Sequence, residues 1–172
     1  MIYFSGFCLE NESELFDQFI DPHNPYHVAG FSLGAIHAMH YVLETKNRVE
    51  KLLLLSPAFF MNKDEKYKRL QKLYYEKDPQ TYCTQFYRNA ASPSTYDLSR
   101  FTVKGESEAL ALLLDYAWDG ALLERIRERG IAIEVFLGGE DRIIDSQEAH
   151  TFFKHYATSY FFKPYGHILQ GA

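Results

Sequence analysis

Three side chains far apart in the sequence, a serine, an aspartate and a histidine, have the chemistry of acyl transfer. Ser32 lies in the stretch Gly30-Phe31-Ser32-Leu33-Gly34, between an apolar segment and a helical pattern. A serine hydroxyl is a weak nucleophile at neutral pH and needs a neighbouring base that an acid holds in place. We predict that Ser32 is a nucleophile on a sharp strand-to-helix turn, where two glycines let backbone pass close by. The alternative is a glycine-rich turn with an inert serine.

The order of the chain predicts the acid and the base. Asp141 comes four residues after a strong strand pattern, and His167 comes five residues after the last one. Both would lie at the carboxyl edge of a parallel sheet, where open α/β folds place their sites. Asp115 is the main rival for the acid because it ends an apolar run, and Asp119 and Asp145 are further substitutes.

Acyl transfer also needs two hydrogen-bond donors aimed at the developing oxyanion. The backbone N–H of Leu33, the residue after the nucleophile, is expected to be one of them. The second should come from the loop after the first strand, where Ser5-Gly6-Phe7 allows a close approach of the backbone. We assign it to the N–H of Phe7, with Gly6 making room.

The patterns that must position these residues alternate between strands and helices. Strands are expected at 2–4, 26–30, 49–55, 131–137 and 159–162, and helices at 11–20, from the serine turn to about 46, and at 66–77, 106–118, 120–129 and 145–157. Asn11 is expected to cap the first helix. The alternation predicts one α/β domain over residues 1–172, with a mostly parallel sheet and helices on both faces. Residues 58–105 break this rhythm and are predicted to form a helical lid.

Composition excludes several classes of protein. The chain has 172 residues, of which 47% are hydrophobic and 24% charged, as in folded globular domains. Two cysteines are too few for a disulfide scaffold, and no leader or membrane-spanning run is evident, so a cytoplasmic protein away from membranes is expected. His37 and His40 lack a third metal ligand, and no phosphate loop or nucleic-acid motif is present, so no metal or cofactor is expected.

The charge is unevenly distributed along the chain. The net charge is −5, yet residues 58–105 hold nine Lys or Arg against five Asp or Glu, a local charge of +4. Within this segment, the pattern of 66–77 predicts an amphipathic helix with Tyr67, Leu70 and Tyr74 on its apolar face. A positive segment on a negative body suggests contact with an acidic partner.

Short motifs occur nearly from end to end. They are Phe4-Ser5-Gly6-Phe7 with Asn11-Glu12-Ser13, Gly30-Phe31-Ser32-Leu33-Gly34-Ala35, Leu53-Leu54-Leu55-Ser56-Pro57, Lys77-Asp78-Pro79-Gln80, Leu113-Leu114-Asp115-Tyr116, Ile133-Glu134-Val135-Phe136 with Asp141-Arg142-Ile143, and His167 with Leu169-Gln170. In this combination the chain resembles the small pimeloyl-acyl-carrier-protein methyl ester esterases of biotin synthesis, close to the short BioV type, which belong to the α/β-hydrolases.

The resemblance implies hydrolysis of the methyl ester at the far end of a pimeloyl chain carried on acyl carrier protein, with methanol released. It implies that Ser32 is the nucleophile, His167 the base and Asp141 the acid. Only 24 positions separate Gly6 from Gly30, fewer than in larger α/β-hydrolases. We therefore expect a reduced α/β-hydrolase sheet of about five strands.

An acidic carrier protein would match the basic lid. The residues expected to bind it are Lys66, Lys68, Arg69, Lys72 and Arg88, although a solvated helix face is the simpler interpretation of any one of them. Two rival functions stay open. One is another serine hydrolase, either an acyl thioesterase or a general carboxylesterase, and the other is a non-catalytic hydrolase-like module that binds a carrier protein.

Overall fold

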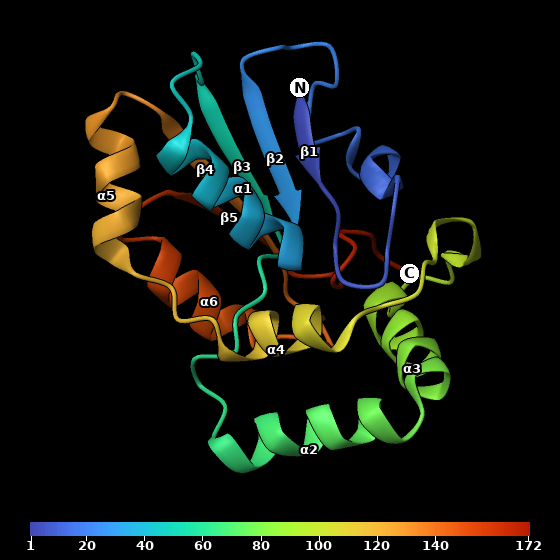
Figure 1. Cartoon of the computed structure of the whole chain (residues 1–172). Coiled ribbons are helices and arrows are strands. Elements are labelled where there is room, and N and C mark those ends of the chain that lie inside the picture. Colours follow the sequence, from blue (N-terminus) through green and yellow to red (C-terminus); the bar gives the residue numbers. More distant parts are fainter.

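A computed structural model describes all 172 residues and shows a single sheet of five parallel strands (Figure 1). The strands are β1 (Ile2–Phe4), β2 (His27–Phe31), β3 (Lys51–Leu55), β4 (Ala132–Gly138) and β5 (Thr158–Phe162). They lie side by side in chain order, and every neighbouring pair is parallel. The predicted α/β class and the predicted number of strands are confirmed.

The central strand β3 is covered on both faces of the sheet. Leu52 and Leu54 belong to one apolar cluster, and Leu53 and Leu55 belong to a second cluster on the opposite face. This division follows from the two-residue period of a strand, which turns alternate side chains to opposite faces. The unbroken run of leucines therefore marks a strand with no solvent-facing side.

The α-helices that connect the strands gather on one face. They are α1 (Leu33–Glu44), α5 (Gly120–Glu128) and α6 (Ser146–Phe153), and all three pack into the larger cluster. Their connections cross the sheet in one direction, and right-handed crossovers then place every helix on the same side. On the opposite face, the second cluster includes Leu15 and Phe16 of η1 (Glu12–Phe16), Ile168 and Leu169 from the end of the chain, and Ala90, Ala91, Leu98 and Phe101 from the segment predicted to be the lid.

The first helix differs from its prediction. A helix over 11–20 with Asn11 as its cap was expected, but η1 is a five-residue 3-10 helix. Asn11 has a φ of 60°, and its side chain makes no capping hydrogen bond. In this left-handed conformation Asn11 turns the chain so that Glu12 enters the interior instead of facing solvent.

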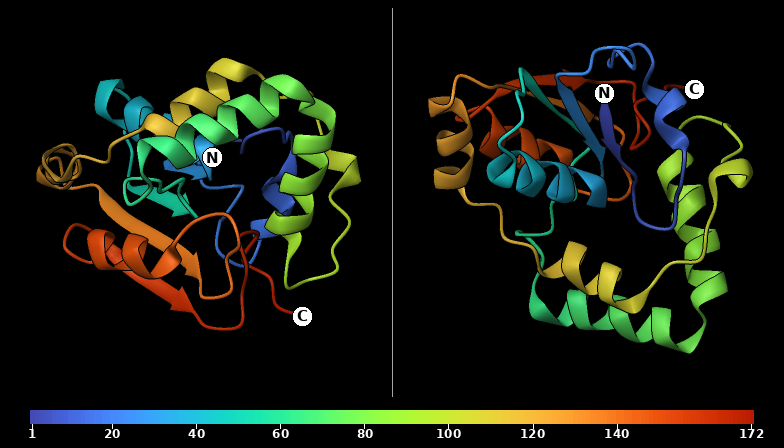
Figure 2. Two further views of the ribbon diagram at one scale, coloured as in Figure 1. Left: turned by 90° about the horizontal axis from the view of Figure 1, so that it is seen from below. Right: turned by 45° about the horizontal axis from the view of Figure 1, so that its top comes forward.

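Helices also form a separate layer beyond the carboxyl ends of the strands (Figures 1 and 2). They are α2 (Glu65–Lys77), α3 (Pro79–Ala91) and α4 (Ser107–Asp115), with the short η2 (Ser99–Phe101) before α4. Helix α3 was not expected from the sequence, although Asp78-Pro79 carries its start signal: Asp78 accepts a hydrogen bond from Thr81 N–H, and proline occupies the first helical position. Each helix in the chain is too short or too polar to cross a lipid bilayer.

Candidate active site

Ser32 occupies the turn between β2 and α1. Its backbone has φ 52° and ψ −113°, a strained conformation for a residue with a Cβ, and only 2% of the residue is exposed. Two neighbouring segments hold the turn: Ser32 N–H donates to Leu55 C=O at 2.9 Å, and Ser32 C=O accepts from Ala58 N–H at 3.1 Å. The structure thus places Ser32 on the predicted sharp turn at the carboxyl edge of the sheet.

The glycines on either side of Ser32 are required by close backbone contacts. A Cβ on Gly30 would lie 2.1 Å from the carbonyl oxygen of Gly34, and a Cβ on Gly34 would lie 2.0 Å from the carbonyl oxygen of Phe4. Atoms cannot approach so closely, and backbone cannot move aside as a flexible side chain can. The prediction that these glycines make room for the turn is confirmed.

Asp141 and His167 form a hydrogen-bonded pair with fully buried side chains. His167 Nδ1 lies 2.6 Å from Asp141 Oδ2, and neither side chain has any exposed area. The other carboxylate oxygen of Asp141 accepts from the N–H groups of Ile143 and Ile144 at 2.7 and 3.0 Å. These bonds fix the carboxylate, and the carboxylate fixes the imidazole ring.

The imidazole ring of His167 lies next to Phe31, the last residue of β2 before the serine turn. The imidazole ring packs 5.0 Å from the ring of Phe31, the residue before Ser32. Its Nε2 atom is buried and has no hydrogen-bond partner, so no bond joins it to the Ser32 hydroxyl in this structure. A buried imidazole nitrogen held in this way is a proton acceptor that lacks only its donor.

The rival carboxylates are engaged elsewhere. Asp115 is half exposed and pairs with Lys72 Nζ at 2.6 Å. Asp119 and Asp145 act as helix N-caps, accepting from backbone N–H groups of α5 and α6 respectively. Of the four candidates, Asp141 is the one that contacts His167.

The two expected oxyanion donors are both available. Leu33 is the first residue of α1, so its N–H has no acceptor within the helix. The N–H of Phe7 donates to no other backbone carbonyl. Both residues are almost fully buried, at 6% and 2% exposure, so a substrate oxygen would meet these N–H groups away from bulk water.

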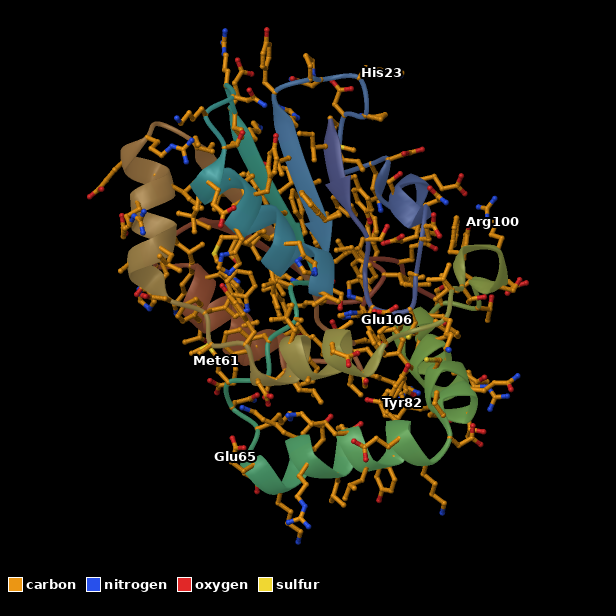
Figure 3. All side chains as sticks on the ribbon, in the orientation of Figure 1. His23, Met61, Glu65, Tyr82, Arg100 and Glu106 are labelled. Atoms are coloured by element: carbon orange, nitrogen blue, oxygen red, sulfur yellow. The ribbon has the colours of Figure 1, made fainter.

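A cavity of about 120 Å³ lies under the helical layer and reaches residues next to this site. Phe7 lines it on one side, and Arg142 and Ile143, which follow Asp141, line it on another. Nine of its 13 lining residues are hydrophobic. The aromatic side chains of α2 and α3 that line this cavity are Tyr67, Tyr82 and Phe86. The hydroxyl of Tyr82 on α3 donates to Gln71 on α2 at 2.9 Å (Figure 3).

The orientation of α2 differs from the predicted one. Tyr75 is the buried residue of this helix, whereas Leu70 and Tyr74, expected on its inner face, are 37% and 56% exposed. Lys68 and Lys72, expected to face outward, instead turn toward the protein. The Lys68 side chain is only 13% exposed and pairs with Glu65, while Lys72 pairs with Asp115 on α4. Ion pairs and hydrogen bonds between the helices, rather than the apolar stripe, set the inner face.

The basic residues expected to bind a carrier protein therefore do not form one surface. Lys66 and Arg69 are exposed on the outer face of α2 and make no ion pair, whereas Lys68 and Lys72 are occupied. Arg88 is exposed on α3, a separate helix. Lys77, which the sequence analysis did not include, is also exposed at the end of α2.

The remaining histidines and the cysteines make contacts of their own. His40 Nε2 lies 2.9 Å from the Tyr116 hydroxyl, and burial, with the neighbouring His40 charge, lowers the pKa of His37. Cys8 and Cys83 are free thiols with sulfur atoms 2.9 Å apart, and burial raises the pKa of Cys8. The structure places no group of three or more His, Cys, Asp or Glu side chains together for a metal ion.

Comparison with known proteins identifies the family. The family described as Hydrolase_4, serine aminopeptidase S33, matches residues 9–166, a span that includes Ser32 and Asp141 and ends one residue before His167. The chain belongs to this serine hydrolase family. None of the curated proteins compared with the chain matches it.

Solved structures show the same fold as this S33 family member. The esterase EaEST from Exiguobacterium antarcticum aligns with a TM-score of 0.61 and 18% identity, over 81% of this chain and 58% of its own. BioG from Haemophilus influenzae aligns at 0.60 and 12% over 97% and 87% of the two chains, and MenH from S. aureus at 0.59 and 11% over 98% and 87%. The chain thus spans little more than half of the esterase but most of the other two proteins.

Proposed function

We propose that this chain is a serine carboxylesterase that hydrolyses the methyl ester of a pimeloyl chain carried on acyl carrier protein. The observation that supports the chemistry is the buried Asp141–His167 pair, whose Nε2 has no hydrogen-bond partner and whose imidazole ring packs against Phe31, the residue before the strained turn at Ser32. The resemblance of the sequence motifs supports the substrate, together with the apolar cavity and the basic outer face of α2.

The first half of the reaction forms an acyl-enzyme. Asp141 accepts the hydrogen bond from His167 Nδ1–H and so leaves Nε2 free to take the Ser32 proton. The serine oxygen attacks the ester carbonyl, and the N–H groups of Leu33 and Phe7 receive the oxyanion. When the tetrahedral intermediate collapses, the C–O bond to the methoxy group breaks, and His167 returns the proton so that methanol leaves.

The second half uses water in place of the serine. His167 takes a proton from water, which attacks the acyl carbonyl, and the bond to Ser32 then breaks as the serine regains the proton. The products are the free carboxylic acid, still attached through its other end to the carrier, and the unchanged enzyme. No atom or electron is needed beyond those of the ester and water.

The outer face of α2 supports a carrier protein as the partner. Lys66, Arg69, Leu70, Leu73 and Lys77 fall at the spacing of one helical face. The three basic side chains make no ion pair, and Leu70 and Leu73 are 37% and 46% exposed. An apolar stripe between basic residues complements an acidic helix that carries apolar side chains, which is the expected surface of the carrier.

The direct test is incubation of the purified protein with the methyl ester of pimeloyl-acyl carrier protein, with Ser32→Ala in parallel. The proposal predicts that the intact carrier loses the mass of one methylene group, keeps its thioester, and stays unchanged with Ser32→Ala. Release of the whole acyl group would show a thioesterase instead. Turnover of small esters alone would show a general carboxylesterase, and no turnover of any ester would favour a non-catalytic binding module.

A further inference from the structure

Glu12 is a carboxylate with no solvent exposure, whereas the nearby polar residues Glu10, Asn11 and Glu14 are exposed. It is the first residue of η1, and its relative exposure is 0%. A carboxylate is costly to bury unless hydrogen-bond donors satisfy it, so the contacts that Glu12 makes are the ones that can offset its burial. Glu12 belongs neither to the set of Ser32, Asp141 and His167 nor to the lining of the 120 Å³ cavity.

The contacts of Glu12 lead to the loop after β1. Its Oε1 atom accepts hydrogen bonds from the N–H of Gly6 at 2.8 Å and from the hydroxyl of Tyr3 at 3.1 Å, while Oε2 is buried without a partner. Burial and the adjacent carboxylate raise the pKa of Tyr3 well above its ordinary value, so the phenol stays protonated as a donor. The bond to Gly6 is the shorter of the two.

The next peptide unit carries the oxyanion donor. The carbonyl of Gly6 accepts from Leu9 N–H at 3.2 Å, and the Gly6–Phe7 peptide bond is trans. In a trans peptide the N–H points away from the C=O, so the Phe7 N–H points away from the turn that Leu9 closes. Glu12 fixes the peptide before Gly6, and Leu9 fixes the peptide after it, which leaves the Phe7 N–H a single direction.

The inference about Glu12 rests on the proposed function, because it concerns the oxyanion donor of that reaction. We propose that Glu12 is a positioning residue that holds the Gly6 N–H and thereby aims the Phe7 N–H at the oxyanion. Glu12 touches neither the substrate nor Ser32, and it acts through the geometry of the loop. Its effect belongs to the transition state, so it changes kcat and leaves KM nearly constant.

Two conservative substitutions of Glu12 separate the effect of side-chain length from the effect of charge. Glu12→Gln keeps the length of the side chain and an oxygen acceptor for Gly6 but removes the charge. Glu12→Asp keeps the charge but is one methylene shorter, so its oxygen no longer reaches Gly6 N–H at 2.8 Å. Tyr3→Phe is the matched control, because it removes the other hydrogen bond to Oε1 and leaves the bond to Gly6 in place.

The measurements are kcat and KM with a p-nitrophenyl ester, inhibition by a methyl trifluoromethyl ketone that forms an oxyanion on Ser32, and melting temperature. We expect Glu12→Asp to lose about 10- to 100-fold in kcat and a similar factor in ketone affinity, at nearly constant KM. We expect Glu12→Gln and Tyr3→Phe to stay within about threefold of the wild type in both.

The inference is overturned if Glu12→Asp keeps the wild-type kcat, or if Glu12→Gln loses as much as Glu12→Asp. It is also overturned if kcat falls in all three variants in proportion to their melting temperatures, because that pattern marks a purely structural carboxylate. Failure of the wild type to hydrolyse the ester at all would instead refute the proposed function. The two failures are therefore distinguishable.

Discussion

Among the individual residues, Asp141 determines which nitrogen of His167 is free to accept a proton. Its carboxylate receives the N–H groups of Ile143 and Ile144 as well as His167 Nδ1. With every donor in place, the ring cannot flip without breaking a buried hydrogen bond. Nε2, which has no partner in the structure, is therefore the nitrogen that we propose accepts the proton.

Asp141→Asn tests this role with little change in shape. The amide can donate to His167 Nδ1 and so stabilise the wrong tautomer, with the proton on Nε2. We expect kcat to fall by about 10⁴-fold while the protein stays folded. The matched control is Asp115→Asn, which breaks a half-exposed ion pair with Lys72 and should change kcat by less than about twofold. Steady-state rates with a p-nitrophenyl ester give kcat for both variants. A larger loss of kcat in Asp115→Asn than in Asp141→Asn would show that the acid is misassigned.

Sequence alone predicted the residues whose positions follow from strand ends, and missed a residue whose burial depends on a distant loop. Ser32, Asp141 and His167 lie at the same edge of the sheet because each follows a strand of one parallel sheet, and Asp141 contacts His167 there. Glu12 stands in a polar stretch that gives no signal of burial. Only the left-handed turn at Asn11 and the nearby N–H of Gly6 bring its carboxylate inside.

The conformation of the serine turn depends on how three segments of the chain pack against one another. The end of β1, the turn itself and the start of α1 touch through backbone atoms at Gly34 and Phe4. Such contacts cannot relax by moving a side chain. The fit of these elements, rather than any single hydrogen bond, is what holds Ser32 in its strained conformation.

Gly34→Ala should therefore destabilise the fold sharply. The new Cβ would lie 2.0 Å from the carbonyl oxygen of Phe4, and we expect a loss of about 3 kcal/mol or more in the free energy of unfolding. For a chain of this length that corresponds to a fall of roughly 10 °C in Tm. Gly171→Ala is the control, because its nearest neighbour is 3.2 Å away, and it should change stability by less than about 0.5 kcal/mol. Thermal denaturation measures both, and a wild-type Tm for Gly34→Ala would contradict the account.

For the helices beyond the strand ends, sequence patterns predict the residue range of a helix better than the face that it buries. The residue range of α2 was predicted to within one position, because capping by Asp64 and the charge pattern are local signals. The inner face of α2 was predicted wrongly, because contacts with α3 and α4 determine it. The residues of α2 that make these contacts are Gln71, Lys72 and Tyr75. A hydrophobic periodicity cannot predict polar contacts with helices whose placement is unknown.

The uneven charge distribution of the chain corresponds to a basic surface on α2. The chain carries a net charge of −5, while the outer face of α2 presents Lys66, Arg69 and Lys77 without acidic partners. Helix α2 lies on the outside of the helical layer, beyond the strand ends (Figure 2). An acidic carrier would be attracted to this side of the protein, where the cavity also lies.

Charge reversal of Lys66, Arg69 and Lys77 to glutamate should raise KM for the carrier-linked ester by about 10-fold at low salt, and by less at high salt. The same variant should hydrolyse a p-nitrophenyl ester within about twofold of the wild-type rate. The matched control reverses Lys46, Arg125 and Lys154, which are exposed outside the helical layer and change the net charge by the same amount. Equal effects of the two variants on the carrier-linked ester would contradict docking on α2.

Covalent labelling is the most direct test of whether Ser32 is a nucleophile that His167 activates. The protein is incubated with a fluorophosphonate probe, digested, and mapped by mass spectrometry, with Ser32→Ala and His167→Ala in parallel. The account predicts one adduct on the peptide that contains Ser32, none with Ser32→Ala, and labelling slowed by at least about 10²-fold with His167→Ala. An unlabelled wild-type protein, or an adduct on another residue, would contradict it.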